Sequence, residues 1–154
     1  AQKEVAVSLN EEVELLRNIP MFSKIDPSNL KLLAFASERV IFGQGQELFH
    51  QGDSGDTAYI IIDGNADVLI DSPGGELAVA RIGKNELVGE IAILCDVPRT
   101  ATLRADDQVT TLAISKDLFF QMVREYPDMG IEIMRELAQR LEQTNAQLRD
   151  ARSA

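Results

Sequence analysis

The sequence predicts an α+β protein in which an eight-stranded antiparallel β jelly roll is flanked by short N-terminal helices and a long C-terminal helix. Its 154 residues, 45% hydrophobic and 26% charged, have the size and composition of one globular domain. Short β-prone runs separated by glycine-bearing turns fill residues 39–114. Helical periodicity replaces this pattern on both sides. We therefore expect helices at 1–38, a β core at 39–114 and further helices at 115–154.

Two short helices are predicted before the β core. Ser8-Leu9-Asn10-Glu11 is a capping-box pattern that begins a helix, and we expect this helix to end near Pro20. Asp26-Pro27 supplies the N-cap and the first-turn proline of the second helix. The faces that continue at helical spacing are Val13, Leu16 and Ile19 in the first helix and Leu30, Leu33, Ala34 and Ser37 in the second.

Seven runs in the β core are typical of strands, and their number approaches the eight of a double-sheet jelly roll. Asp63-Gly64 is predicted to be a hairpin turn, because both residue types tolerate positive φ, and Ser72-Pro73-Gly74-Gly75 marks a second turn. The seven runs are Arg39–Phe42, Glu47–His50, Ala58–Ile62, Ala66–Asp71, Leu77–Ile82, Thr100–Ala105 and Val109–Ile114.

Two helices are predicted after the β core. Ser115 is placed to cap a helix that ends near Tyr126-Pro127, and a final helix runs from about Asp128. Two interpretations of its first half stay open, namely packing on its own domain through Ile131, Met134 and Leu137 or pairing with another helix. Beyond Leu141 the pattern favours a partner helix. The heptad positions are Met134, Leu137, Leu141, Thr144, Leu148 and Ala151.

Composition argues against several classes of function. The net charge of -10 repels nucleic acid, and no apolar stretch of about 18 residues or signal pattern indicates membrane contact by this segment. The single Cys95 cannot form an intrachain disulfide, which fits a reducing cytoplasm. A jelly-roll metalloenzyme needs several histidine ligands, and nucleophilic catalysis needs a base beside its nucleophile, but His50 is the one histidine. We therefore expect no metal site and no catalysis.

The segment Gly89–Thr102 carries the residues suited to recognising an anion. Glycine allows close approach of the backbone, and a short helical turn beginning there would aim free N–H groups at the anion. Arg99 offers a planar fork of donors that matches a phosphate, and Glu90 can accept a hydrogen bond from a sugar hydroxyl. The alternative for Arg99 is an ordinary surface ion pair.

This segment resembles the phosphate-binding cassette of cyclic-nucleotide-binding domains, which occur in bacterial catabolite activators, cyclic-nucleotide-dependent kinases and gated channels. The similarity lies in Gly89-Glu90-Ile91-Ala92-Ile93-Leu94 and, after a short gap, in Pro98-Arg99-Thr100-Ala101-Thr102. Upstream, Gly45–Asp53 and Tyr59–Gly64 are similar to strand turns of the family, and Leu15–Phe22 is similar to its first helix. The resemblance covers roughly residues 12 to 148.

The resemblance implies a role for each matching residue. Glu90 would bind the ribose 2′-hydroxyl, Arg99 would pair with the cyclic phosphate, and Thr100 would contact phosphate or base. Thr144 and Asn145 match a pair in the catabolite activators that touches adenine, in which the second residue reaches the ligand of the partner subunit. Asn145 stands where those proteins have Ser. The alternative is that both residues are a solvated polar pair. The implied ligand-binding residues are Val88, Gly89, Glu90, Ile91, Ala92, Arg99, Thr100, Ala101, Thr144 and Asn145.

The resemblance thus implies a regulatory domain that binds a cyclic nucleotide, cyclic AMP in preference to cyclic GMP, and moves its C-terminal helices in response. Residues 39–114 would form the ligand-binding core, and 115–154 a lid and a homodimer seam through Met134, Leu137, Leu141 and Leu148. The alternative is a nucleotide-free interaction module with a degenerate pocket. Because the chain begins with Ala rather than Met, we expect a larger parent protein. A transcription factor is one candidate, whose helix-turn-helix would lie beyond Ala154.

Overall fold

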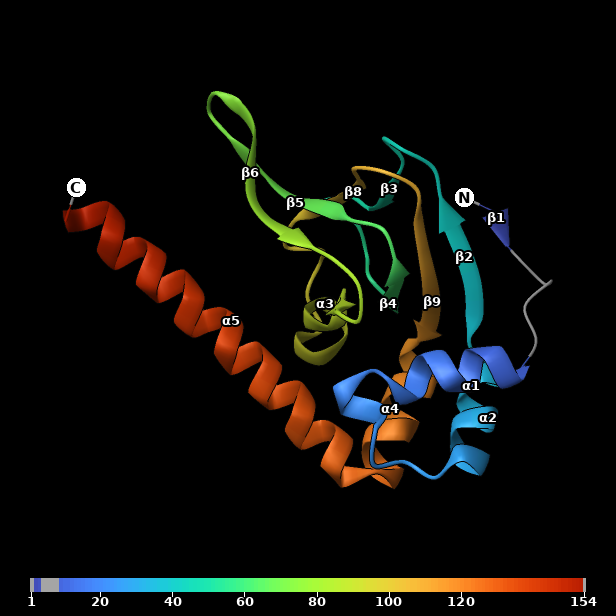
Figure 1. Cartoon of the computed structure of the whole chain (residues 1–154). Coiled ribbons are helices and arrows are strands. Elements are labelled where there is room, and N and C mark those ends of the chain that lie inside the picture. The colour runs from blue at the N-terminus through green and yellow to red at the C-terminus, as the bar shows by residue number, and fades with distance from the viewer. Residues whose placement is uncertain (1, 4–8, 154) are drawn as a thin grey trace.

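The computed structural model describes residues 2–3 and 9–153 of the chain. Helices α1 (Leu9–Arg17), η1 (Pro20–Phe22, a 3-10 helix) and α2 (Pro27–Ala36) gather with α4 (Lys116–Glu125) at one end of a β body (Figure 1). Both helices expected before the β core are confirmed. The predicted cap residue Ser8 lies outside the described residues, and Asp26 holds the N-cap position of α2 without a side-chain hydrogen bond.

The β body consists of two antiparallel sheets. Within the described residues, a five-stranded sheet has the order β1-β2-β9-β4-β7 and a four-stranded sheet has the order β3-β8-β5-β6. All seven predicted runs contain strands, whereas the two-residue strands β1 and β7 are too short to give a sequence pattern. The bounds are β1 (Gln2–Lys3), β2 (Glu38–Phe42), β3 (Glu47–Phe49), β4 (Thr57–Asp63), β5 (Ala66–Ser72), β6 (Gly75–Ile82), β7 (Leu87–Val88), β8 (Thr102–Ala105) and β9 (Val109–Ser115).

Two predictions about the strands were wrong. Asp63-Gly64 is not a hairpin turn, because β4 pairs with β7 and β9 while β5 pairs with β6 and β8, so this connection crosses between the sheets. Gly64 does have a positive φ, of 92°. The run predicted at Thr100–Ala105 becomes a strand only at Thr102, which leaves Thr100 and Ala101 in a loop. The turn at Ser72–Gly75 does close a hairpin, between β5 and β6.

The hydrophobic core has two parts, and β4 contributes to both. Ile60 and Ile62 pack against the helices, while Ile61 faces the space between the sheets. Successive side chains of a strand point to opposite faces, so the unbroken apolar run of β4 indicates a strand that is buried on both sides. This buried strand is the fixed wall against which the neighbouring segments are held.

The last two helices differ in how firmly they pack. Ser115 caps α4, its Oγ accepting a hydrogen bond from the Leu118 amide at 3.2 Å. Helix α5 (Pro127–Ser153) packs on its own domain through Met129, Ile133 and Leu137, whereas Ile131 and Met134, predicted to make this contact, are exposed. Leu137 belongs to both sets. The buried face repeats every four residues through Ile133 and Met129, whereas the predicted trio repeats every three through Met134 and Ile131.

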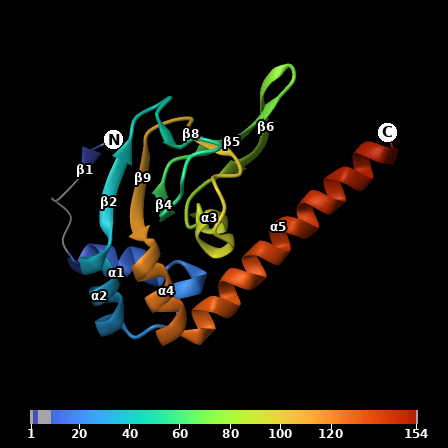
Figure 2. The ribbon, with the colours of Figure 1, turned by 180° about the vertical axis from the view of Figure 1, so that it is seen from behind.

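The second half of α5 stands clear of the body in both views (Figures 1 and 2). From Leu141 to Arg152, Ala146 is the one residue with even partial burial. None of the helices in the described part of the chain is long and apolar enough to cross a membrane.

Replacing Gly64 by alanine should destabilise the fold strongly. An added Cβ would lie 2.3 Å from the Gln108 carbonyl oxygen, and an L-residue is strained at this φ. We expect a loss of about 3 kcal/mol or more in the free energy of unfolding, measured with denaturant. Gly45→Ala is the matched control, because its φ is 83° but no atom lies within 4 Å of the added Cβ. Equal losses in the two variants would show that the close approach at Gly64 is unimportant.

Candidate functional site

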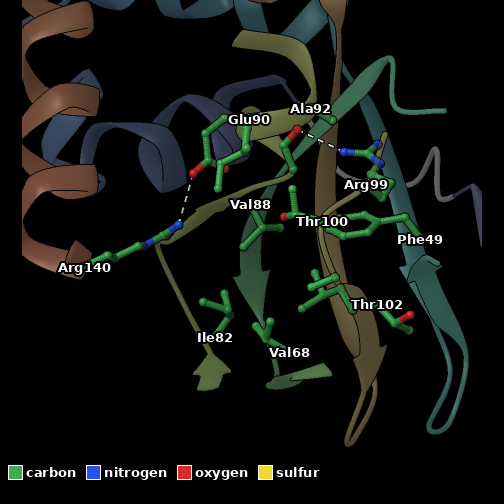
Figure 3. Close-up of a pocket in the computed structure, with 14 residues that line it drawn as sticks. Phe49, Val68, Ile82, Val88, Glu90, Ala92, Arg99, Thr100, Thr102 and Arg140 are labelled. Atoms are coloured by element: carbon green, nitrogen blue, oxygen red, sulfur yellow. Dashed lines mark hydrogen bonds and ion pairs between the residues drawn. The ribbon is translucent and has the colours of Figure 1, made fainter. Parts of the chain in front are cut away.

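A cavity lies between residues 88–102 and the strands β5 and β6 (Figure 3). It contains about 500 Å³ of space between protein atoms, part of it open to solvent. Residues 88–102 contribute Val88, the short helix α3 (Glu90–Cys95) with its N-cap Gly89, and the loop before β8. The residues that line the cavity are Phe49, Val68, Ile82, Val88, Gly89, Glu90, Ile91, Ala92, Arg99, Thr100, Ala101, Thr102, Leu103 and Arg140.

Arg99 lies at one end of this cavity with its guanidinium almost fully buried. Its Nη1 donates to the Gly89 carbonyl at 2.9 Å and its Nη2 to the Thr57 carbonyl at 2.7 Å, while its Nε finds no acceptor in the described part of the chain. The side chain is 6% exposed, and burial lowers the pKa of the guanidinium. None of the described carboxylates forms an ion pair with it, so the alternative of a surface ion pair does not hold for these residues.

Two glycines make room for this arginine. A Cβ on Gly55 would lie 2.6 Å from Arg99 Nε, and a Cβ on Gly89 would lie 2.8 Å from Nη1. Both distances are shorter than real contacts allow, so a side chain at either position would displace the guanidinium. The glycines of the sequence pattern thus do more than form turns here.

Glu90 is the second charged group at the cavity, and it is 2% exposed. Burial raises the pKa of its carboxyl, and the Arg140 guanidinium opposes this shift. Arg140 Nη1 lies 3.2 Å from Glu90 Oε1, and Figure 3 shows the two side chains pointing toward one another. A residue of α5 is therefore tied directly to the cassette.

Arg140 is shared among several acceptors. Its Nη2 donates to the Leu87 carbonyl at 2.7 Å and to Glu136 Oε1 at 3.0 Å, and lies 3.5 Å from Glu86 Oε2. Burial also raises the pKa of Glu136. Arg140 is a site residue that the sequence patterns did not predict. The local signal for Arg140 was Glu136, four residues earlier on the same helix. Its other partner, Glu90, lies fifty residues away in the sequence.

The structure brings eight of the ten predicted site residues to the cavity, all of them between Val88 and Ala101. It does not bring Thr144 and Asn145 there. Both are exposed on the projecting half of α5, and the Thr144 hydroxyl donates to the Arg140 carbonyl at 3.0 Å. This bond within the helix satisfies the hydroxyl, as the alternative of a solvated polar pair expects.

His50 and the acidic groups give no sign of a metal centre. His50 Nδ1 lies 3.0 Å from Glu47 Oε1 at the end of β3, with about half of its side chain exposed. Among the residues that the structure describes, no three His, Cys, Asp or Glu side chains are grouped so as to hold a metal ion. The cavity presents two arginines, a glutamate and apolar walls.

The fold and this cavity define a class of β domain whose cavity contains a buried guanidinium and a buried carboxylate. The family model described as "Cyclic nucleotide-binding domain" matches residues 39–126, more than half of the chain. The chain therefore belongs to the cyclic nucleotide-binding domain family, whose domains are regulatory.

Relatives of this chain are parts of proteins with different activities, among them an enzyme and a transcriptional regulator. Lysophospholipase nte1 of Neosartorya fischeri is 32% identical over 130 residues, which cover 84% of this chain but 8% of the fungal protein. The CRP-like cAMP-activated global transcriptional regulator of Mycobacterium tuberculosis is 29% identical over 138 residues, 89% of this chain and 62% of the regulator. The chain thus spans less than two thirds of these relatives. The catabolite activator protein of Thermus thermophilus superposes with a TM-score of 0.74 at 28% identity, covering 84% of this chain and 61% of that one.

The stability of a Glu90→Gln variant relative to the native chain should depend on pH. Because burial raises the pKa of Glu90 above its ordinary value of 4.5, the folded state favours the protonated carboxyl. The native chain therefore loses stability from this group as the pH rises from about 4.5 through the raised pKa, and glutamine does not. We expect the free energy of unfolding of Glu90→Gln to increase relative to the native chain between pH 4 and pH 8.

The control is Glu142→Gln, at an exposed carboxylate on the projecting half of α5. It reports the effect of removing one negative charge from the surface. A Glu90→Gln advantage that shrinks as the pH rises would contradict the prediction.

Proposed function

We propose that this domain binds cyclic AMP in preference to cyclic GMP in the cavity and converts binding into movement of its C-terminal helices. The observation that carries the proposal is the buried guanidinium of Arg99, whose Nε finds no acceptor and which forms no ion pair among the residues that the structure describes. A buried cation is costly unless it is paired, and the cyclic phosphate supplies the missing negative charge. The preference for cyclic AMP rests on the mycobacterial relative, which is described as cAMP-activated, and on the sequence match of Thr144 and Asn145, which do not line the cavity of their own chain.

Each part of the nucleotide has a suitable surface in the cavity. The phosphate fits between Arg99 and the N-terminal amides of α3, the ribose 2′-hydroxyl donates to Glu90, and the base lies against apolar side chains. Thr100 and Ala101, which precede β8, line the cavity beside Arg99. The apolar walls are Val68, Ile82, Val88 and Leu103.

The proposed output runs through Arg140. Glu90 Oε1 already receives a hydrogen bond from Arg140, so a ribose hydroxyl arriving at Glu90 changes the balance of bonds that hold α5 to the cassette. Because a ligand shifts an equilibrium by its differential affinity for two states, this shared carboxylate gives the nucleotide a direct influence on the position of α5.

We also infer that the two sheets form the predicted jelly roll. Counting from β2, the sheet orders are 1-8-3-6 and 2-7-4-5, so that connections repeatedly cross from one sheet to the other. This alternation suits a body that is closed around a cavity at one end.

A second proposal is that the projecting half of α5 pairs with α5 of a second copy. Met134, Leu141 and Leu148 repeat every seven residues and are each about 60% exposed. Leu137 of the predicted seam packs against its own core instead. An isolated helix as short as the projecting half of α5 is only marginally stable in water, so a partner helix would stabilise it.

Arg99→Leu should abolish most of the affinity for cyclic AMP in calorimetric titration. Stranding a phosphate in a desolvated site costs roughly 3 to 5 kcal/mol, on the order of a hundred- to a few thousand-fold. Glu90→Gln should cost about 1 to 3 kcal/mol, because an acceptor oxygen survives. Arg81→Leu, at a half-exposed arginine paired with Asp67 and Asp106, is the matched control and should bind normally.

Three outcomes would change the assignment. Normal binding by Arg99→Leu would remove the phosphate role, and a larger loss from Glu90→Gln than from Arg99→Leu would exchange the two roles. A native chain whose melting temperature rises with neither cyclic nucleotide would indicate the alternative of an interaction module with a degenerate pocket.

Leu141→Glu should weaken self-association of the chain by at least roughly tenfold, because it places two carboxylates across the proposed seam in place of two buried leucines. Sedimentation equilibrium with and without cyclic AMP measures this. Gln143→Glu adds the same charge at an exposed position outside the seam and should leave association unchanged. If cyclic AMP does not tighten association of the native chain, the seam is not coupled to the cavity.

A further inference from the structure

Arg99 owes its position to an aromatic side chain as well as to its hydrogen bonds. The guanidinium carbon Cζ lies 4.2 Å from the centre of the Phe49 ring, within the range of a cation–π interaction. Figure 3 shows Phe49 directly beside Arg99 at the end of the cavity. A Cβ on Gly89 would also lie 3.4 Å from Phe49 Cε2, so ring, glycine and guanidinium meet at one place.

Phe49 is itself held by a column of rings. It stacks on Tyr59 with centroids 6.4 Å apart, and Tyr59 meets Phe42 edge to face at 5.8 Å. Phe42 is 5% exposed and belongs to the core between the sheets. The column therefore connects the core to the guanidinium through three strands, β2, β4 and β3.

The local backbone supports this placement. Phe49 is the last residue of β3, and the pairing of β3 with β8 shifts register between Glu47 and Phe49. Such an irregularity changes the direction in which a strand side chain points. The ring faces Arg99 from the strand that lies at the edge of its sheet.

We propose that Phe49 is a positioning residue, whose ring confines the Arg99 guanidinium so that it is ordered before an anionic ligand arrives. This inference rests on the proposed function, because it gives the arginine its phosphate role. Arginine has many rotamers, and a ligand that must order such a side chain loses affinity. Gly55 and Gly89 leave room for the guanidinium, and the Gly89 and Thr57 carbonyls accept hydrogen bonds from its Nη atoms. The Phe49 ring packs against the guanidinium and restricts its movement further.

The test compares Phe49→Leu, Phe49→Tyr and Phe42→Leu in the full chain. Phe49→Leu should bind cyclic AMP about 2- to 12-fold more weakly, the range expected for ordering one long side chain. Phe49→Tyr keeps the ring and should bind like the native chain. Phe42→Leu removes the ring farthest from Arg99 and leaves Tyr59 stacked on Phe49, so it should lower the unfolding midpoint as Phe49→Leu does but leave affinity unchanged.

Two further measurements separate positioning of Arg99 from direct contact between Phe49 and the nucleotide. In an Arg99→Leu background, titrated by NMR at millimolar nucleotide, Phe49→Leu should cause no additional loss. Without any nucleotide, the Arg99 Nε–H resonance should be sharp and shifted by the ring in the native chain, Phe49→Tyr and Phe42→Leu, and should broaden or lose that shift in Phe49→Leu.

The results distinguish this inference from the proposed function. If the native chain binds no cyclic nucleotide but the Arg99 resonance responds as described, the function is wrong and the positioning stands. If the native chain binds and Phe49→Leu changes neither affinity nor resonance, the positioning role is overturned.

Discussion

The arrangement of the cavity depends on the hydrogen bonds of one buried arginine. Arg99 links the two ends of the cassette to residues 53–57. Its side chain donates to the carbonyls of Gly89 and of Thr57 in β4, and its backbone amide donates to the Asp53 carbonyl at 2.8 Å. The Gly52 amide in turn donates to the Arg99 carbonyl at 2.9 Å. A cationic side chain whose two Nη atoms donate to carbonyl groups holds the loop, the strand and α3 together without forming an ion pair among the described residues.

The sequence predicted those parts of the fold that local patterns determine. Alternation, turn residues and caps identified seven strands and the helices, since each depends on residues within one or two turns of the chain. Local patterns could not predict that β4 and β5 belong to different sheets, because a glycine with a positive φ, such as Gly64, suits a hairpin turn as well as a crossing connection. Strand β7 gave no pattern because it has two residues.

The candidate site was predictable where it is continuous in sequence and not where it is assembled by the fold. Eight predicted residues from Val88 to Ala101 line the cavity because one segment carries them. Arg140 and Phe49 come from α5 and β3, and their neighbours in sequence give no sign that they meet Glu90 and Arg99. Their partners follow from long-range packing, which the periodicity of a single chain does not contain.

Helix α5 has a mechanical property that follows from its dimensions. At about 1.5 Å per residue, Arg140 lies roughly 20 Å along the axis from Pro127, and Ser153 lies roughly 40 Å along it. If α5 turns as a rigid rod about its first residue, displacement grows in proportion to that length. A shift of about 1 Å where Arg140 meets Glu90 then becomes about 2 Å at the far end, so α5 is a lever with a gain of roughly two.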